Sequence, residues 1–376
     1  MNVFELHDVR FAYNPHLPPI LDGLDLEIGQ GVRTAILGAN GAGKTTLFNT
    51  LTGVNRPQSG EVLYNGSPVA YSREGLMDIR SDVAVVLQNP DEQIFNSLVE
   101  EDVAFGPLNI GLSIGEVEER VEKALRDVRL TGLDRRPLQQ LSGGQRKRVA
   151  IAGALAMDPG TIIMDEPTAG LDPQAAVEVM ELAEKLSLRG VTVLISTHDM
   201  DLAFKWADKT SVLCGGKVAF SGMADDLFSD TVLTDRCGLV IPSILGMNGN
   251  ISAIRGTDPA PYPHSMCEFI AKFGGSKGSG MLTLVPAPEE EAVPRFDEMT
   301  RDRSGSEVGI FGPDVRFQLQ HREVDYMFEG LDCCFAEAVK GRDAILLFDP
   351  VYMPTVQRQI DRIAELGFDL DYEVVG

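Results

Sequence analysis

One stretch constrains this chain more than any other: residues 37–46, with the sequence Leu-Gly-Ala-Asn-Gly-Ala-Gly-Lys-Thr-Thr. It follows the apolar run 34–37, which predicts a buried strand, and it precedes residues 47–51, whose apolar positions have helical spacing. A strand, a glycine-rich turn and a helix start in this order form the phosphate-binding P-loop pattern G-x-x-x-x-G-K-[ST]. The sequence therefore predicts a phosphate site at a strand-to-helix turn.

Each residue type in this turn has a chemical role. Gly38, Gly41 and Gly43 let the backbone curl because glycine tolerates positive φ, so several N–H groups point inward and form an anion site with the positive end of the next helix. Lys44 would reach the β and γ phosphates, and Thr45 would offer its hydroxyl to Mg²⁺. The predicted nucleotide site takes in most of the turn: Gly38, Asn40, Gly41, Ala42, Gly43, Lys44, Thr45 and Thr46.

The composition argues against several classes of protein. Asp and Glu outnumber Lys and Arg by 56 to 33, for a net charge of −23, and so acidic a surface repels phosphodiester backbones. We therefore do not expect nucleic acid as a main partner. No apolar run is long enough for a membrane-spanning helix, the amino terminus has no export signal, and the five cysteines lack the spacing of a disulfide framework. These features predict a globular protein of the cytosol.

Two polar side chains at strand ends each have two possible roles. Gln88 follows a predicted buried strand over residues 82–87, where it is either a ligand for Mg²⁺ or the attacking water, or a plain loop residue. Tyr13 ends an alternating strand upstream of the P-loop. It either stacks on a nucleotide base or simply packs against its neighbours.

Two more predicted strands end in groups that suit phosphate chemistry. The strand over residues 161–166 ends in Asp165 and Glu166. An Asp there can hold Mg²⁺ through water, and the next carboxylate can polarise the water that attacks the γ phosphate. His198 follows the strand over residues 191–196, where a histidine can contact a γ phosphate.

A second anion site is predicted at residues 141–148, Leu-Ser-Gly-Gly-Gln-Arg-Lys-Arg, which lead into a helical run. Ser142 can cap that helix, while Gly143 and Gly144 leave its first N–H groups bare. Two phosphate sites in one chain indicate that something is held between them.

Residues 89–95 and 99–107 combine clustered acids with apolar side chains that have no obvious place in a core. This segment is either a solvated acidic loop or a docking groove for a basic helix of a partner protein. Asp91 and Glu92 are the residues that would bind such a helix.

Together these motifs resemble the ATP-binding subunit of an ATP-binding cassette (ABC) transporter. The resemblance covers residues 1 to about 228 and implies a P-loop NTPase cassette, in which a RecA-like parallel sheet is joined to an antiparallel β subdomain and a helical subdomain. The matching motifs are Walker A (38–45), the adenine-stacking aromatic (Tyr13), the Q-loop (Gln88), the signature (141–145), Walker B with its catalytic glutamate (162–166), the D-loop (Leu171, Asp172) and the switch histidine (His198).

Within that superfamily, residues 88–107 resemble the ATPases of energy-coupling factor (ECF) importers, including the cobalt and nickel type. In that group the segment after the Q-loop binds basic coupling helices of a membrane component, which favours the docking interpretation of Asp91 and Glu92. The resemblance implies a peripheral motor at the cytoplasmic face of the membrane that imports cobalt or nickel ions or a vitamin. Its partners would be a transmembrane coupling protein, a substrate-binding membrane component and a second ATPase, either a copy of this chain or a close relative.

The resemblance also implies a mechanism. Two chains pair head to tail and bury two ATP molecules, and the signature of one chain completes the γ-phosphate site of the other. The implied roles are catalysis by Lys44, Gln88, Glu166 and His198, Mg²⁺ binding by Thr45, Gln88 and Asp165, and nucleotide contact across the dimer by Ser142, Gly143, Gly144, Gln145 and Asp172.

The predicted organisation has three parts: the ABC domain (1–228), a connecting segment (229–280) with linkers at 256–263 and 274–280, and a small α/β domain (281–376). In the last part, strands are predicted at 281–285, 307–311 and 344–348, and helices at 289–300, 324–339 and 351–366. Its role is either to reinforce a dimer or to sense a ligand.

Two other functions stay open. One is a soluble ABC ATPase that acts on DNA or ribosomes, although the short stretch between Lys44 and Ser142 leaves no room for the long coiled coil of DNA-repair members. The other is an ATP-gated sensor in which residues 281–376 bind the signal.

Overall fold

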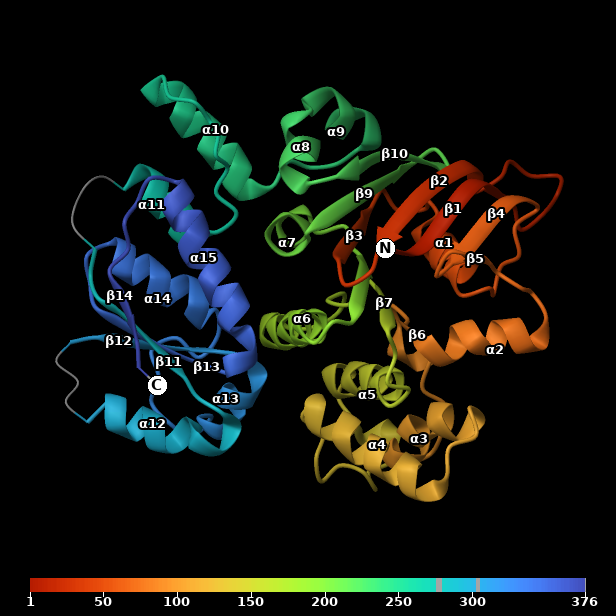
Figure 1. The fold of residues 1–376 in the computed structure, drawn as a ribbon, viewed down its shortest axis with the longest axis horizontal. Coiled ribbons are helices and arrows are strands. Elements are labelled where there is room, and N and C mark those ends of the chain that lie inside the picture. The colour runs from red at the N-terminus through yellow and green to blue at the C-terminus, as the bar shows by residue number, and fades with distance from the viewer. Residues whose placement is uncertain (275–278, 302–304, 376) are drawn as a thin grey trace. The chain divides into compact units, whose positions relative to one another are not determined.

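The computed structural model describes residues 1–274, 279–301 and 305–375 (Figure 1). Of the linker predicted at 274–280, residues 275–278 lie outside the described part. The chain divides into two compact units, residues 1–240 and 241–376.

A six-stranded sheet forms the centre of the first unit, and five of its described strands run parallel. β3, β7 and β8 are buried along their whole length, as expected for parallel strands covered on both faces. β10 pairs antiparallel with β9 at one edge. Across the sheet the order is β10 (Lys217–Gly222), β9 (Lys209–Cys214), β3 (Arg33–Leu37), β8 (Thr192–Ser196), β7 (Thr161–Asp165) and β6 (Val83–Val86).

A second, antiparallel sheet carries the amino terminus. Its order is β2 (Leu21–Gly29), β1 (Asn2–Phe11), β4 (Ser59–Tyr64) and β5 (Ser67–Pro68). β4 and β5 form a hairpin, with Asn65 and Gly66 at positive φ in its turn. One apolar core joins this sheet to the central one through α1 (Lys44–Leu51), with Phe4, Ile36 and Phe48 among its buried members.

Three helices pack against one another as a helical subdomain at the lower end of Figure 1: α3 (Val99–Asn109), α4 (Ile114–Asp127) and α5 (Gly143–Leu155). A capping box of Ser113 and Glu116 starts α4. The expected three-part cassette is therefore confirmed. The other helices of the first unit are α2 (Arg73–Asp82), α6 (Pro173–Leu188), α7 (Met200–Trp206), α8 (Ala224–Ser229) and α9 (Thr231–Cys237), with short 3-10 turns η1 (Pro90–Glu92) and η2 (Leu138–Gln140).

The first unit extends past the boundary predicted at residue 228. α8 and α9 pack back against β9, and the ring of Phe228 lies 5.7 Å from that of Phe204, edge to face. Because these contacts bury Leu227 and Phe228, the unit ends only at Val240.

The second unit contains the expected α/β domain. Its parallel four-stranded sheet has the order β12 (Glu307–Phe311), β13 (Ala344–Phe348), β11 (Leu282–Pro286) and β14 (Tyr372–Val374). Its helices are α10 (Ser243–Arg255), α11 (Met266–Phe273), α12 (Ala292–Met299), α13 (Pro313–Gln318), α14 (Gly330–Val339) and α15 (Met353–Glu365), with η3 (Glu289–Glu291) and η4 (Pro350–Tyr352).

Two features of this unit differ from the sequence prediction. The helix predicted over 324–339 starts only at Gly330, because Asp325 and Tyr326 bond to the Val308 carbonyl at 3.1 and 3.0 Å and extend along β12. The unit also begins before residue 281. α11, which lies in the predicted connecting segment, packs on α14 and α15 and so belongs to this core.

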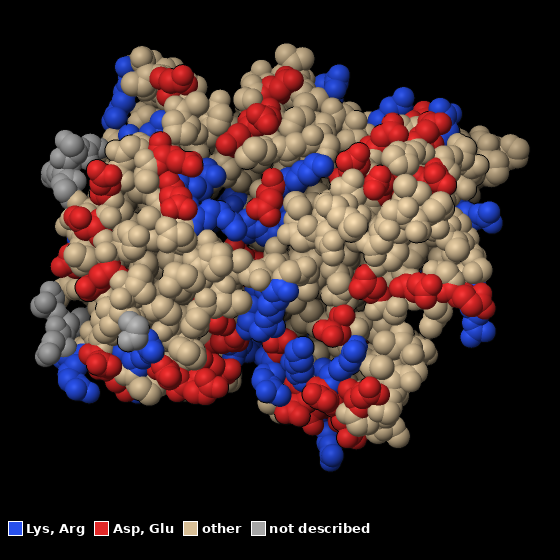
Figure 2. All heavy atoms as spheres, in the orientation of Figure 1, with Lys and Arg blue, Asp and Glu red and all other residues tan. Residues whose placement is uncertain are grey.

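Acidic side chains are scattered over the drawn faces of both units in Figure 2. This distribution agrees with the net charge of −23. Among the helices described, none has the length and apolar character that crossing a membrane requires.

Candidate functional site

Four groups of predicted site residues follow parallel strands of the central sheet. The glycine-rich turn 38–43 follows β3, Gln88 follows β6, Glu166 follows β7 and His198 follows β8. Because these strands are parallel, their carboxyl ends share one edge of the sheet, where ligands of open α/β sheets bind.

The turn before α1 has the backbone that its glycines predict. Gly38, Gly41 and Gly43 have φ values of 150°, 80° and 102°. A Cβ atom on Gly38 would lie 2.6 Å from the Leu213 carbonyl oxygen, and one on Gly43 would lie 3.0 Å from the Ile20 side chain. The turn therefore has no room for side chains at these two positions.

Lys44 and Thr45 connect this turn to the carboxylates at the end of β7. The buried Lys44 ammonium donates to the Gly38 carbonyl oxygen at 2.8 Å, and its Nζ lies 3.7 Å from Glu166 Oε1. The Thr45 hydroxyl donates to Asp165 Oδ2 at 2.6 Å. One anion-binding turn and two buried carboxylates thus form a single cluster.

Glu166 is held from both sides. His198 Nδ1 lies 2.7 Å from Glu166 Oε2, and the Glu166 N–H donates to Ser196 Oγ at 2.9 Å. The Ser196 hydroxyl also donates to the other oxygen of Asp165. Glu166 has a φ of 46°, a strained value for a residue with a side chain, and such strain is concentrated at functional sites.

Tyr13 stands beside the start of α1. Its hydroxyl lies 3.4 Å from Thr46 Oγ1, and this hydrogen bond lowers the pKa of Tyr13. The residue is 62% exposed, and its ring meets Phe11 edge to face. It therefore offers an open face for stacking next to the glycine-rich turn.

The cluster has the chemistry that a magnesium nucleotide needs. The hydroxyl of Thr45 and the carboxylate of Asp165 are the hard oxygen ligands that Mg²⁺ prefers. The glycine turn and the Lys44 ammonium suit the phosphates. Glu166 and His198 lie close enough to act on the same proton.

Comparison with known proteins identifies the family. The family model described as "ABC transporter" matches residues 21–169. The Energy-coupling factor transporter ATP-binding protein EcfA of Methanocaldococcus jannaschii is 46% identical over 244 residues, which cover 65% of this chain and 87% of that protein. The chain belongs to the ATP-binding proteins of ECF-type ABC transporters. It is accordingly an ATP-binding ATPase of the ABC transporter type.

Two further relatives extend this result. EcfA2 of Methanospirillum hungatei is 42% identical over 361 residues, covering 92% of this chain and 89% of that protein, so the similarity reaches into the second unit. Among solved structures, CbiO1 from Clostridium perfringens, described as part of the ABC transporter complex CbiONQ, is 35% identical. It superposes with a TM-score of 0.58 over 68% of this chain and 99% of its own.

The signature residues of this ECF ATPase form the start of α5. Ser142 Oγ accepts from the Gln145 N–H at 3.2 Å, and Gln145 Oε1 accepts from the Ser142 N–H at 3.0 Å, so the predicted cap is a full capping box. Asp172 caps α6 with a single hydrogen bond, accepting from the Ala175 N–H at 2.9 Å. Within one chain, the side chains of Ser142, Gln145 and Asp172 thus hold the starts of their own helices.

The two acids predicted to dock a partner lie in η1 and already have contacts in this ECF ATPase. Asp91 Oδ1 is 2.8 Å from Arg146 Nε, so its charge is shared with α5. Glu92 Oε1 accepts from the Asn89 side chain at 3.2 Å. Asp91 remains 59% exposed, so a partner can still reach it.

Three supporting residues escape a motif-based prediction. Ser196 is a small residue at a strand end, and Gln93 fixes the end of β6 by accepting from the Leu87 N–H at 2.8 Å. Lys147 is buried, and its ammonium donates to the carbonyl oxygens of Leu87 and Gln88. One sequence signal for Lys147 exists: it lies four residues before the buried Ile151, so it occupies an inward position of α5.

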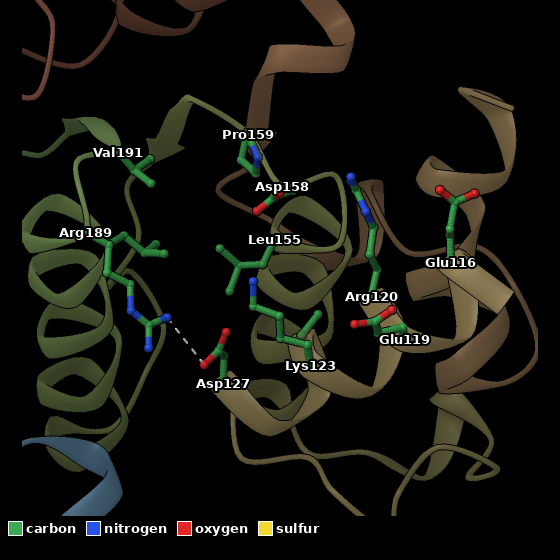
Figure 3. Close-up of a pocket in the computed structure, with 12 residues that line it drawn as sticks. Glu116, Glu119, Arg120, Lys123, Asp127, Leu155, Asp158, Pro159, Arg189 and Val191 are labelled. Atoms are coloured by element: carbon green, nitrogen blue, oxygen red, sulfur yellow. Dashed lines mark ion pairs between the residues drawn. The ribbon is translucent and has the colours of Figure 1, made fainter. Parts of the chain in front are cut away.

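The ECF ATPase also has a cavity of about 510 Å³ between α4 and α6, shown in Figure 3. Arg120 and Lys123 of α4 line it, and Arg189 approaches Asp127 to 3.7 Å across it. None of the predicted site residues lines this cavity. It is therefore distinct from the nucleotide site.

Proposed function

We propose that this chain pairs head to tail with a second copy or a close relative, closes around two ATP molecules, and drives an importer of cobalt or nickel ions or of a vitamin. The observation that carries the proposal is the arrangement of its two anion sites. The glycine-rich turn shares one cluster with Asp165 and Glu166, whereas Gly143 and Gly144 lie in the first turn of a different helix. Such a pair of sites suits a nucleotide held between two chains.

Within one chain, the hydrolytic step is the attack of water on the γ phosphate to give ADP and phosphate. The Glu166 carboxylate accepts the proton of that water, and His198, whose Nδ1 lies 2.7 Å from Glu166 Oε2, contacts the γ phosphate. Lys44 exchanges its bond to the Gly38 carbonyl for a phosphate oxygen. Mg²⁺, held by Thr45, Gln88 and, through water, Asp165, would supply neutralising charge beside the phosphates.

The partner chain completes the site. Its amides at Ser142, Gly143 and Gly144, together with Gln145 and Asp172, meet the γ phosphate from the opposite side. Charge stabilisation from a partner is worth roughly 10³ to 10⁵ in rate among P-loop enzymes, so a lone subunit is a poor ATPase.

The docking surface consists of η1 with Phe95 and Phe105, and we assign to it a basic coupling helix of a transmembrane protein. The two phenylalanines are 64% and 46% exposed and contact each other edge to face at 4.7 Å. Exposed aromatic side chains beside Asp91 and Glu92 suit an amphipathic helix with basic flanks. This contact would place the chain at the cytoplasmic face of the membrane, next to a separate substrate-binding membrane component.

Changing Glu166 to Gln tests the catalytic part of the proposal. We expect Glu166→Gln to bind ATP, to form a dimer on size-exclusion chromatography with Mg-ATP, and to release phosphate at least about a hundredfold more slowly. Glu181→Gln, which changes another buried glutamate, should turn over normally and is the matched control. A Glu166→Gln protein that stays monomeric in saturating Mg-ATP, or that turns over fully, would contradict the proposal.

Co-purification from detergent-solubilised membranes tests the transport part. We expect transmembrane proteins to accompany the wild type, and Phe95→Ala with Phe105→Ala to abolish this without changing ATP affinity. Ile114→Ala, which alters an exposed apolar residue on α4, is the control. Recovery of ribosomes or DNA in place of membrane proteins would refute an importer, and uptake of radiolabelled Co²⁺, Ni²⁺ or vitamin by the assembled complex would decide the substrate.

A further inference from the structure

Lys147 is a buried cation that the hydrolytic step does not use. It is 1% exposed and lies in the second turn of α5. Both features oppose a charge there, because burial removes water and the amino-terminal end of a helix is positive. Burial lowers the pKa of Lys147 to about 8, even though Asp165 and Glu166 attract its charge.

The hydrogen bonds of the Lys147 ammonium offset the unfavourable free energy of burying its charge. Its Nζ donates to the Leu87 carbonyl oxygen at 2.8 Å and to the Gln88 carbonyl oxygen at 3.0 Å. These carbonyls belong to the first two residues after β6. A lysine on the signature helix therefore holds the backbone of the Q-loop residue.

A second side chain completes this connection. Gln93 accepts from the Leu87 N–H at 2.8 Å, and its amide donates to the carbonyl oxygens of Val85 at 3.1 Å and Ala150 at 3.3 Å. Ala150 belongs to α5. The end of β6 is thus bonded to α5 twice, so a displacement of the helix moves Gln88 with it.

We propose that Lys147 is a positioning residue that couples the two nucleotide sites of the dimer. The inference rests on the proposed head-to-tail pairing, in which the first turn of α5 meets the nucleotide bound to the opposite chain. Lys147 lies about 7.5 Å beyond Ser142 along the same rigid helix, at a rise of 1.5 Å per residue. Nucleotide contact at Ser142 is thereby transmitted to Gln88 in the chain's own site.

The test is ATP hydrolysis by the full-length protein as a function of ATP concentration. Lys147→Met keeps most of the side-chain length and removes the donors. We expect the Hill coefficient to fall from about two toward one and kcat to fall about tenfold. Binding of a non-hydrolysable ATP analogue to the dilute monomer should stay within about threefold of the wild type, because Lys147 acts through Gln88 rather than on the nucleotide.

Rescue and control variants separate coupling from folding. Lys147→Arg retains charge and donors and should restore at least half of the cooperativity. Lys185→Met removes another buried lysine, on α6, and should leave the Hill coefficient unchanged. If Lys147→Met does not fold, Lys147→Gln decides the question, since it is shorter, uncharged and still polar, and we expect the same loss of cooperativity.

Two outcomes would overturn the inference: full cooperativity in Lys147→Met or Lys147→Gln, or an equal loss in Lys185→Met. Failure of the underlying dimer looks different. In that case the wild type itself hydrolyses ATP without cooperativity, and Glu166→Gln forms no dimer with ATP.

Discussion

Ser196 contacts both acidic residues of the site through one hydroxyl group. The hydroxyl donates to Asp165 and accepts from the Glu166 N–H, and the side chain is fully buried at the end of β8. The positive φ of Glu166 is sustained in part by this bond. The geometry of the two acids therefore depends on a residue that takes no part in the chemistry.

Replacing this residue should affect stability and rate together. Ser196→Ala leaves the Glu166 N–H and one Asp165 oxygen without their partner, which should cost about 1–3 kcal/mol in the free energy of unfolding. Misplacing the carboxylates should slow hydrolysis by about 10- to 100-fold, as loss of such supporting contacts does at metal sites. Urea unfolding and phosphate release measure the two effects.

Ser211→Ala is the matched control for this change. Ser211 is also fully buried and bonds through its hydroxyl to Ser221 at 2.9 Å. We expect it to lose stability but to keep its rate per folded molecule. Equal rates for the two variants would show that Ser196 is merely structural.

Among the elements, the local sequence pattern predicted the strands and helices whose limits depend on nearby residues alone. The strands β3, β6, β7 and β8 are apolar runs bounded by polar turns, so their positions follow from the sequence. The helical spacing over 324–339 misled, because residues 325 and 326 bond to β12 and tertiary pairing overrides local propensity.

The same distinction applies to the candidate site: residues in local motifs were predicted, and contacts between distant segments were not. The glycine turn, Asp165, Glu166 and His198 belong to recognisable motifs, and the structure gathers them at one edge of the sheet. The contacts of Ser196 and Lys147 join segments far apart in sequence, so no local pattern specifies them. The ion pair of Asp91 with Arg146 also arises only once η1 packs on α5, so local pattern does not specify it either.

Two helix caps can be compared to separate a structural role from a role in hydrolysis. Ser113 caps α4 in a capping box with Glu116, and Asp172 caps α6 by accepting from the Ala175 N–H. Ser113→Ala and Asp172→Ala should each cost about 1 kcal/mol in the free energy of unfolding. Only Asp172→Ala should slow hydrolysis beyond the loss of folded protein, because the proposed dimer places Asp172 at the partner's nucleotide. Rates normalised to the folded fraction measure this, and equal normalised rates for the two variants would remove Asp172 from the site.

Across the whole molecule, the nucleotide cluster and the single tryptophan lie in the same unit. Trp206 is buried in the first unit beside Arg33, whose guanidinium lies 5.6 Å from its ring. Cys267 and Cys334 are fully buried in the second unit. The chain thus contains a native fluorescence probe for one unit and native thiol probes for the other.

We expect ATP to stabilise only the first unit, and these probes can measure the unfolding of each unit separately. At a free ATP concentration about 100 times its Kd, binding to the folded state alone should add about 2.7 kcal/mol to the free energy of unfolding of the first unit. Urea titration should then shift the Trp206 transition upward, while pulse labelling of Cys267 and Cys334, located by peptide mass, should show no shift. Lys44→Ala should abolish the Trp206 shift by weakening nucleotide binding. Equal shifts for all three probes would mean that the two units unfold as one cooperative body, and the second unit would then be part of the machinery that ATP stabilises.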